Sequence, residues 1–183
     1  MSTQRIPSLP LNETTGQTRQ ILDDVNRTLN IVPNLYGVMA HSPATLQGYL
    51  ALGRVREHGL LSKPLQERIA LTVAQANQCD YCLSAHTALA KQVGLTEEQI
   101  LRSREADASD PKTRAALQFA RLMVVDRGNV SEAEFAQLRD AGFSHGEIVE
   151  IVFNVTINIM TNYLNHVANT VVDFPAVPAL EWA

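Results

Sequence analysis

The stretch from Glu67 to His86 constrains the fold more than any other part of this 183-residue sequence. It contains both cysteines of the chain, Cys79 and Cys82, at Cys-x-x-Cys spacing, and His86 follows four residues after the second. Two thiols and an imidazole so arranged supply an attacking sulfur, a resolving sulfur and a proton acceptor. One continuous helix would hold Glu67 about 18 Å from Cys79, too far for any hydrogen bond.

A bend in the chain at Asn77 and Gln78 would remove this separation. The run of apolar residues stops there, and asparagine competes with helical backbone hydrogen bonds. If two antiparallel helices meet at the bend, Glu67 lies about ten residues before it and His86 about eight residues after it, so the two side chains come level. The sequence therefore predicts a helix pair over residues 62–93.

The helix pair predicts a proton relay that runs from Glu67 through His86 to Cys82, which lies one turn before the histidine. Cys79 would then stand at the start of the second helix, where unpaired N–H groups and the helix dipole favour a thiolate. The base close to Cys82 favours that residue as the attacking sulfur. The lower pKa usual for the first cysteine of such motifs favours Cys79 instead.

The pattern Glu-x11-Cys-x2-Cys-x3-His resembles the active-site signature of the alkylhydroperoxidase D branch of the carboxymuconolactone decarboxylase superfamily. The resemblance covers nearly the whole chain, because four further segments are similar to peroxidase-related members: Ile6-Pro7-Ser8-Leu9-Pro10, Val32-Pro33-Asn34-Leu35, His41-Ser42-Pro43-Ala44 and Asn165-His166-Val167-Ala168. Tyr81 stands where the alkylhydroperoxidase has a second histidine, and tyrosine is a much weaker base near neutral pH.

The resemblance implies a thiol peroxidase that reduces organic hydroperoxides in antioxidant defence. In that role Glu67 orients His86, His86 holds Cys82 as the thiolate, and Cys79 closes a disulfide with the sulfenic acid of Cys82. An external dithiol, either a protein or a lipoyl-type group, would reset the pair. No bound cofactor or metal is expected. The family forms trimers and hexamers, so the resemblance also implies a homo-oligomer.

Three other interpretations remain open at this point. The chain is a non-redox lyase like the decarboxylase that names the superfamily, or it is a binding protein without turnover. A zinc site is a third interpretation, although Cys79, Cys82 and His86 supply only three of the four ligands that structural zinc requires. For Tyr81, a contact with the thiols and a packing role are equally expected. His166, Asn162 and Asn165 would line the same cavity if the two halves of the chain pack face to face, but interhelical hydrogen bonds are favoured for them.

Composition limits the class of protein. The chain is 45% hydrophobic and 19% charged with a net charge of −4, values typical of a globular protein of one domain. It has no cluster of basic and aromatic residues of the kind that binds nucleic acid. The most apolar segment, Ile148 to Ile159, is too short to span a membrane, and no signal peptide is evident, so a cytoplasmic location is expected.

Sequence signals for helix N-caps and helix C-terminal ends predict a single all-α domain of about eight to ten helices over residues 1–183. Residues 1–14 are rich in proline and predict an extended N-terminal arm that reaches over a neighbouring subunit. When the sequence is aligned with itself at a shift of eighty residues, Glu67 aligns with Glu147 and His86 aligns with His166. The two cysteines align with Ile159 and Asn162. This alignment predicts a degenerate second helix pair over residues 144–172, although chance alignment of two amphipathic segments remains the alternative.

Overall fold

A computed structural model describes residues 4–181 of the chain. These residues contain no β-strand, which confirms the prediction of an all-α fold. They form one short 3-10 helix and nine α-helices: η1 (Leu11–Glu13), α1 (Gly16–Leu29), α2 (Asn34–Met39), α3 (Pro43–Glu57), α4 (Lys63–Ala76), α5 (Asp80–Gln92), α6 (Glu97–Arg104), α7 (Pro111–Val125), α8 (Glu132–Asp140) and α9 (His145–Ala168).

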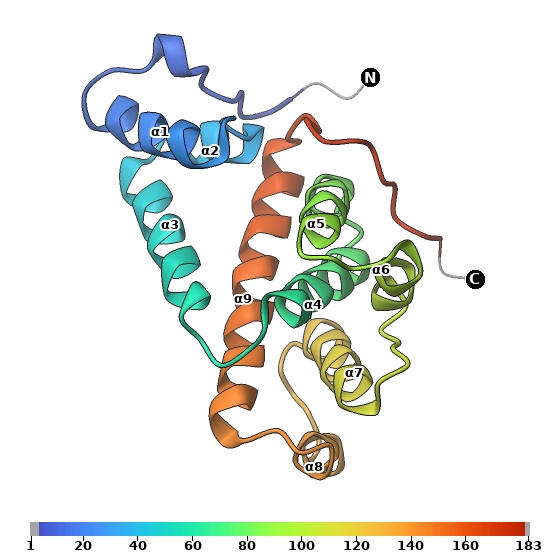
Figure 1. The fold of residues 1–183 in the computed structure, drawn as a ribbon. Coiled ribbons are helices and arrows are strands. Elements are labelled where there is room, and N and C mark those ends of the chain that lie inside the picture. Colours follow the sequence, from blue (N-terminus) through green and yellow to red (C-terminus); the bar gives the residue numbers. More distant parts are fainter. Residues whose placement is uncertain (1–3, 182–183) are drawn as a thin grey trace.

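Helix α4 is the centre of the molecule, with α5, α6, α7 and α9 packed around it (Figure 1). Its residues from 66 to 75 are all buried, as expected for a helix surrounded by other helices. Leu71 and Ala74 face an apolar cluster shared with α1, α2 and α5. Ile69 and Val73 face a second cluster shared with α7 and α9. The helix that carries Glu67 is therefore held rigidly on all sides.

Residues 4–14 of the N-terminal arm are extended apart from the single turn of η1, and they lie on their own chain; residues 1–3 lie outside the described residues. The backbone N–H groups of Arg5 and Ile6 donate to the carbonyl of Ala168 at the end of α9, and Leu9 donates to Gly37 in α2. A Cβ atom at Gly37 would collide with Ser8 and would lie 3.0 Å from the Leu9 carbonyl. Glycine at this position therefore allows the close approach of the arm.

Residues 169–181, the described part of the segment after α9, contain no helix and run back across the outside of α4, α5 and α6 (Figure 1). Buried polar side chains hold its backbone. Gln75 donates to the carbonyl of Leu180 at 3.1 Å and accepts from the Leu180 N–H at 3.2 Å, while Ser84 accepts from the N–H of Val177 at 2.9 Å. Residues 4–14 and 169–181 thus both fold back onto the helices.

The prediction of a second helix pair over residues 144–172 is wrong, because α9 is one continuous helix of 24 residues. Glu147 closes a capping box with Ser144 at its start, and His166 lies in its last turn, about 28 Å away. The position that would match the bend is Asn158, whose amide donates to the carbonyl of Asn154 one turn earlier. Because Asn158 stays within the helical pattern, nothing breaks the helix there.

Across residues 4–181, no helix is both long and apolar enough to cross a membrane.

Candidate active site

The helix pair bends at Asn77 and Gln78, as the sequence predicts. Helix α4 ends at Ala76, Gln78 adopts the left-handed conformation with φ of 54°, and α5 begins after Cys79. The N–H of Cys79 donates to the carbonyl of Ala74 at 2.9 Å and so satisfies one of the last carbonyls of α4. The reversal therefore takes only three residues, and it sets α4 and α5 side by side.

Cys79 and Cys82 are joined in a disulfide, with their Cα atoms 5.3 Å apart. Cys79 caps the N-terminus of α5, where its Sγ accepts a hydrogen bond from the N–H of Cys82 at 3.3 Å. Each cysteine is only 2% exposed. The fold therefore places both sulfurs within bonding distance at a helix N-terminus, where the local field favours a thiolate.

Glu67 and His86 come level across the helix pair, as the bend predicts. The Nδ1 atom of His86 lies 2.8 Å from Oε2 of Glu67, and Glu67 is only 6% exposed. Burial alone would raise the pKa of the Glu67 carboxyl, but the charge and hydrogen bond of His86, together with Arg56, outweigh it and hold that pKa below its ordinary value. The carboxylate is thus ionised, and it fixes Nδ1 as its partner, which leaves Nε2 to exchange protons.

Helix α3 adds a cation that the sequence did not single out. Nη2 of Arg56 lies 3.9 Å from Oε1 of Glu67, and the Arg56 side chain is largely buried. Tyr49 lies two turns earlier on the same helix and packs edge-on against Tyr36, with 5.6 Å between ring centroids. Burial raises the pKa of both tyrosines, so they remain neutral. The sequence contains one indication that Tyr49 and Arg56 lie on the same surface. They are seven residues apart, which places them on one face of a helix.

Helix α9 contributes a polar side chain directly to the disulfide. Asn165 is buried at 5% exposure, and its Nδ2 donates to Sγ of Cys82 at 3.3 Å. Asn165 has only weak support from the sequence, because it lies 83 positions from Cys82. No local pattern links them, and their contact depends on how α9 packs against α5.

The remaining candidates lie around the bend. The Tyr81 hydroxyl accepts from the N–H of Leu35 at 3.1 Å, and its ring packs edge-on against Phe174. Burial raises the pKa of the Tyr81 phenol, so the residue is neutral and packs α5 against α2 and the C-terminal segment.

Asn162 and His166 make the interhelical hydrogen bonds that the sequence favours for them. Oδ1 of Asn162 accepts from Nδ2 of Asn77 at 2.9 Å, and Nε2 of His166 lies 2.9 Å from the carbonyl oxygen of Asn77. Both residues therefore tie α9 to the bend that separates Glu67 from the cysteines. Their contacts hold the helix pair in place.

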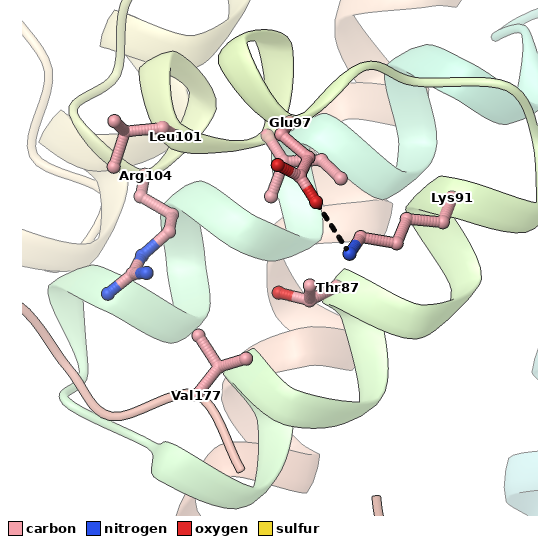
Figure 2. A pocket seen from close by; sticks show the side chains of 7 residues that line it. Thr87, Lys91, Glu97, Leu101, Arg104 and Val177 are labelled. Carbon is pink, nitrogen blue, oxygen red and sulfur yellow. Dashed lines mark hydrogen bonds and ion pairs between the residues drawn. The ribbon is translucent and has the colours of Figure 1, made fainter. Parts of the chain in front are cut away.

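Two surface cavities lie away from the disulfide. One, of about 190 Å³, is bounded by α5, α6 and Val177, with the Lys91–Glu97 ion pair at its edge (Figure 2). Lys91 lies nine residues after Cys82, on the opposite side of α5. The other cavity, of about 260 Å³, lies beside Glu147 at the start of α9. In the described part of the chain, no group of three acidic, histidine or cysteine residues is placed to hold a metal ion.

A family model matches the part of the chain that contains this helix pair. The model of the carboxymuconolactone decarboxylase family matches residues 43–122, which include Glu67, both cysteines and His86. The uncharacterized protein YdfG of Bacillus subtilis (strain 168) is 26% identical over 82 residues, which cover 43% of this chain. The match spans 56% of the length of YdfG, so this chain covers little more than half of that relative.

Solved structures share the whole fold. A peroxidase-related protein from Silicibacter sp. TM1040 superposes with a TM-score of 0.80 at 24% identity, over 93% of this chain and 94% of the other. A peroxidase-related protein from Ralstonia eutropha JMP134, described as an alkylhydroperoxidase core, gives 0.80 at 25% identity and 94% coverage of both chains. The debrominase Bmp8, bound to 2,3,4-tribromopyrrole, gives 0.78 at 20% identity, over 94% of this chain and 93% of its own. The resemblance drawn from the sequence is therefore confirmed.

Proposed function

We propose that this alkylhydroperoxidase D-like protein of the carboxymuconolactone decarboxylase superfamily is a thiol peroxidase that reduces organic hydroperoxides. The observation that carries the proposal is the buried Glu67–His86 pair, 2.8 Å apart, on the helix pair that also holds the Cys79–Cys82 disulfide. A carboxylate that orients an imidazole is the usual means of activating a nearby nucleophile. The likeness to peroxidase-related structures supports the same reaction class.

The reaction begins from the reduced pair. The Cys82 thiolate attacks the terminal oxygen of the hydroperoxide, so that an S–O bond forms, the O–O bond breaks and the alkoxide leaves. Protonated His86 gives the alkoxide its proton, and the products are an alcohol and the sulfenic acid of Cys82. The Cys79 thiol then attacks that sulfur, releases water and leaves the disulfide. Each turnover thus transfers two electrons from the two thiols to the peroxide.

Both sulfurs have features that suit these roles. The Cys79 sulfur accepts a backbone hydrogen bond at the helix N-terminus, which favours its thiolate for the second attack. Cys82 lies one helical turn before His86, which makes it the better partner for a base. A dithiol donor, either a protein or a lipoyl-type group, resets the disulfide by exchange. A reducing, cytoplasmic compartment would keep such a donor available.

A second candidate is the reductive removal of bromine, which the fold shared with the debrominase Bmp8 suggests. The same dithiol would supply the two electrons and end as the same disulfide, with bromide as the leaving group. A lyase of the decarboxylase type and a binding protein without turnover need no thiol chemistry. The state of the cysteines after reaction therefore separates the redox candidates from the others.

Steady-state assays with a dithiol donor test the proposal. We expect the wild-type protein to consume an organic hydroperoxide, and both Cys82→Ser and Cys79→Ser to lose turnover. With one equivalent of hydroperoxide, Cys79→Ser should accumulate a sulfenic acid that dimedone traps, whereas Cys82→Ser should not. Turnover retained in Cys82→Ser would contradict the assignment of the attacking sulfur. Turnover of a bromopyrrole alone would favour the second candidate.

The oligomeric state is also part of the proposal. The family resemblance implies a trimer or hexamer, and light scattering of the purified protein measures the mass directly. A monomeric mass at micromolar protein concentration would contradict the proposed homo-oligomer.

A further inference from the structure

Helix α9 presents a row of buried polar side chains to the helix pair. Asn154, Asn158, Asn162 and Asn165 recur every three or four residues and are each at most 5% exposed. Two of the four amides donate within their own helix, Asn154 to the carbonyl of Glu150 and Asn158 to that of Asn154. Within the described part of the chain, Asn165 is the member of the row that reaches a sulfur.

We propose that Asn165 is a further catalytic residue, whose amide N–H stabilises the Cys82 thiolate and whose carbonyl oxygen holds the hydroxyl of the Cys82 sulfenic acid. The inference rests on the proposed thiol peroxidase function. Nδ2 of Asn165 lies 3.3 Å from Sγ of Cys82. The residue touches the sulfur that reacts.

The hydrogen bond strengthens when the disulfide is opened. A sulfur without charge is a weak acceptor, whereas a thiolate is an anion, and bonds to ionised acceptors are about twice as strong as neutral ones. The amide of Asn165 thus interacts more strongly with the thiolate than with the thiol or the disulfide. Because it favours the charged form, it lowers the pKa of Cys82. Its own neutrality means that it does so without taking or giving a proton.

The other end of the Asn165 amide is unused in the disulfide form. Its Oδ1 is buried and has no hydrogen-bond donor among the described residues. Leaving a buried carbonyl oxygen without a donor is costly. The sulfenic acid of Cys82 would bring an O–H group one bond away from the sulfur that Nδ2 already contacts. This hydroxyl supplies the missing donor, so Asn165 stabilises the intermediate until Cys79 attacks.

The test compares Asn165→Leu, which keeps the size of the side chain and removes both polar ends, with Asn165→Ala. Asn158→Leu is the matched control, because Asn158 is similarly buried on the same helix but its amide donates to the carbonyl of Asn154 and not to a sulfur. Each is made in the Cys79→Ser background, so that Cys82 is the single thiol. His86, Glu67 and Arg56 stay in place in all variants, and circular dichroism confirms that each variant is folded.

The first readout is the rate of Cys82 alkylation by iodoacetamide as a function of pH, which needs no peroxide. We expect the midpoint of this profile to rise by about one pH unit in both Asn165 variants and to stay unchanged in Asn158→Leu. The second readout is oxidation by tert-butyl hydroperoxide, which we expect to slow by about tenfold or more. Dimedone trapping should also show a sulfenic acid that decays faster than in the parent protein.

An unchanged alkylation profile in both Asn165 variants would overturn the proposal, as would an equal shift in Asn158→Leu. Failure of the proposed function has a different signature. If the hydroperoxide leaves Cys82 unoxidised in the parent protein, the peroxidase assignment fails, while the alkylation profile still decides whether Asn165 stabilises the thiolate.

Discussion

A buried carboxylate is the residue on which the proposed chemistry depends. Glu67 is 6% exposed, and it is ionised because His86 and Arg56 compensate for the loss of water around it. A buried charge that loses its partners is strongly destabilising. The Arg56–Glu67 ion pair and the His86–Glu67 hydrogen bond therefore have two effects. They fix the orientation of the imidazole, and they neutralise the buried charge of the carboxylate.

Replacement of Glu67 by glutamine should lower kcat/KM for hydroperoxide by at least about tenfold, because a neutral amide neither stabilises protonated His86 nor fixes its tautomer. Glu147→Gln is the control, since that carboxylate caps α9 and pairs with Lys112. Steady-state rates with a dithiol donor measure both variants. Equal rates for Glu67→Gln and the wild type would remove Glu67 from the relay.

The same carboxylate should make stability depend on pH. The folded-state pKa of Glu67 lies below its ordinary value of 4.5, so the unfolded state binds more protons at pH values between the two. The resulting stabilisation is fully present above pH 4.5 and is lost as the pH falls through the lowered pKa. Urea unfolding at neutral pH and at pH about 3 should therefore show a smaller change in the free energy of unfolding for Glu67→Gln than for the wild type. The exposed Glu98, changed to glutamine, should leave the wild-type change intact.

At the scale of elements, the bend between α4 and α5 is the part of the fold that the sequence predicts best. The end of the apolar run, the asparagine at position 77 and the cysteine cap are all local signals, and local geometry then sets Glu67 level with His86. The sequence misses contacts that depend on packing, such as that between Asn165 and Cys82. The sequence also leads to the wrong prediction of a second helix pair in place of α9. The alignment at a shift of eighty residues compares residue types and carries no information on whether the backbone bends.

Gln78 is strained by the bend, because a residue with a Cβ atom at φ of 54° crowds its own carbonyl. Glycine adopts this conformation freely, so Gln78→Gly should raise the free energy of unfolding by about 0.5–1 kcal/mol, whereas the β-branched Gln78→Val should lower it by about 1–2 kcal/mol. In the exposed last turn of α5, Gln92→Gly should have the opposite sign and destabilise by a similar amount. Urea unfolding measures all three. A destabilising Gln78→Gly would show that the bend is not under backbone strain.

At the scale of the whole molecule, residues 4–14 and 169–181 pack against the helices, and the Cys79–Cys82 pair is buried in the core. Both cysteines are only 2% exposed, so little of either side chain contacts solvent. The C-terminal segment is held by a buried polar cluster. Oε1 of Gln75 accepts from Arg104 at 3.0 Å and from the Leu180 N–H, while Arg104 donates to the carbonyl of Pro178 at 2.7 Å.

Gln75→Ala should release this segment and leave the buried Arg104 without one of its acceptors. We expect a loss of about 3 kcal/mol in the free energy of unfolding, because unpaired buried polar groups are costly and a charged one more so. Hydrogen exchange should rise most at Leu180, whose N–H donates to Gln75. It should also rise in the same segment at Val177 and Ala179, whose N–H groups donate to Ser84 and Asp80. On the exposed face of α8, Gln137→Ala should change stability by less than about 0.5 kcal/mol. If hydrogen exchange at Leu180 stayed slow in Gln75→Ala, the cluster would not be what holds the segment.

The measurement that tests the central claim most directly is a count of free thiols, with intact mass, on reduced protein before and after one equivalent of an organic hydroperoxide. If Cys79 and Cys82 are the reducing pair, both thiols disappear, the mass falls by about 2 Da as the disulfide closes, and one equivalent of alcohol forms. Two unreacted thiols and an intact hydroperoxide would contradict the peroxidase account.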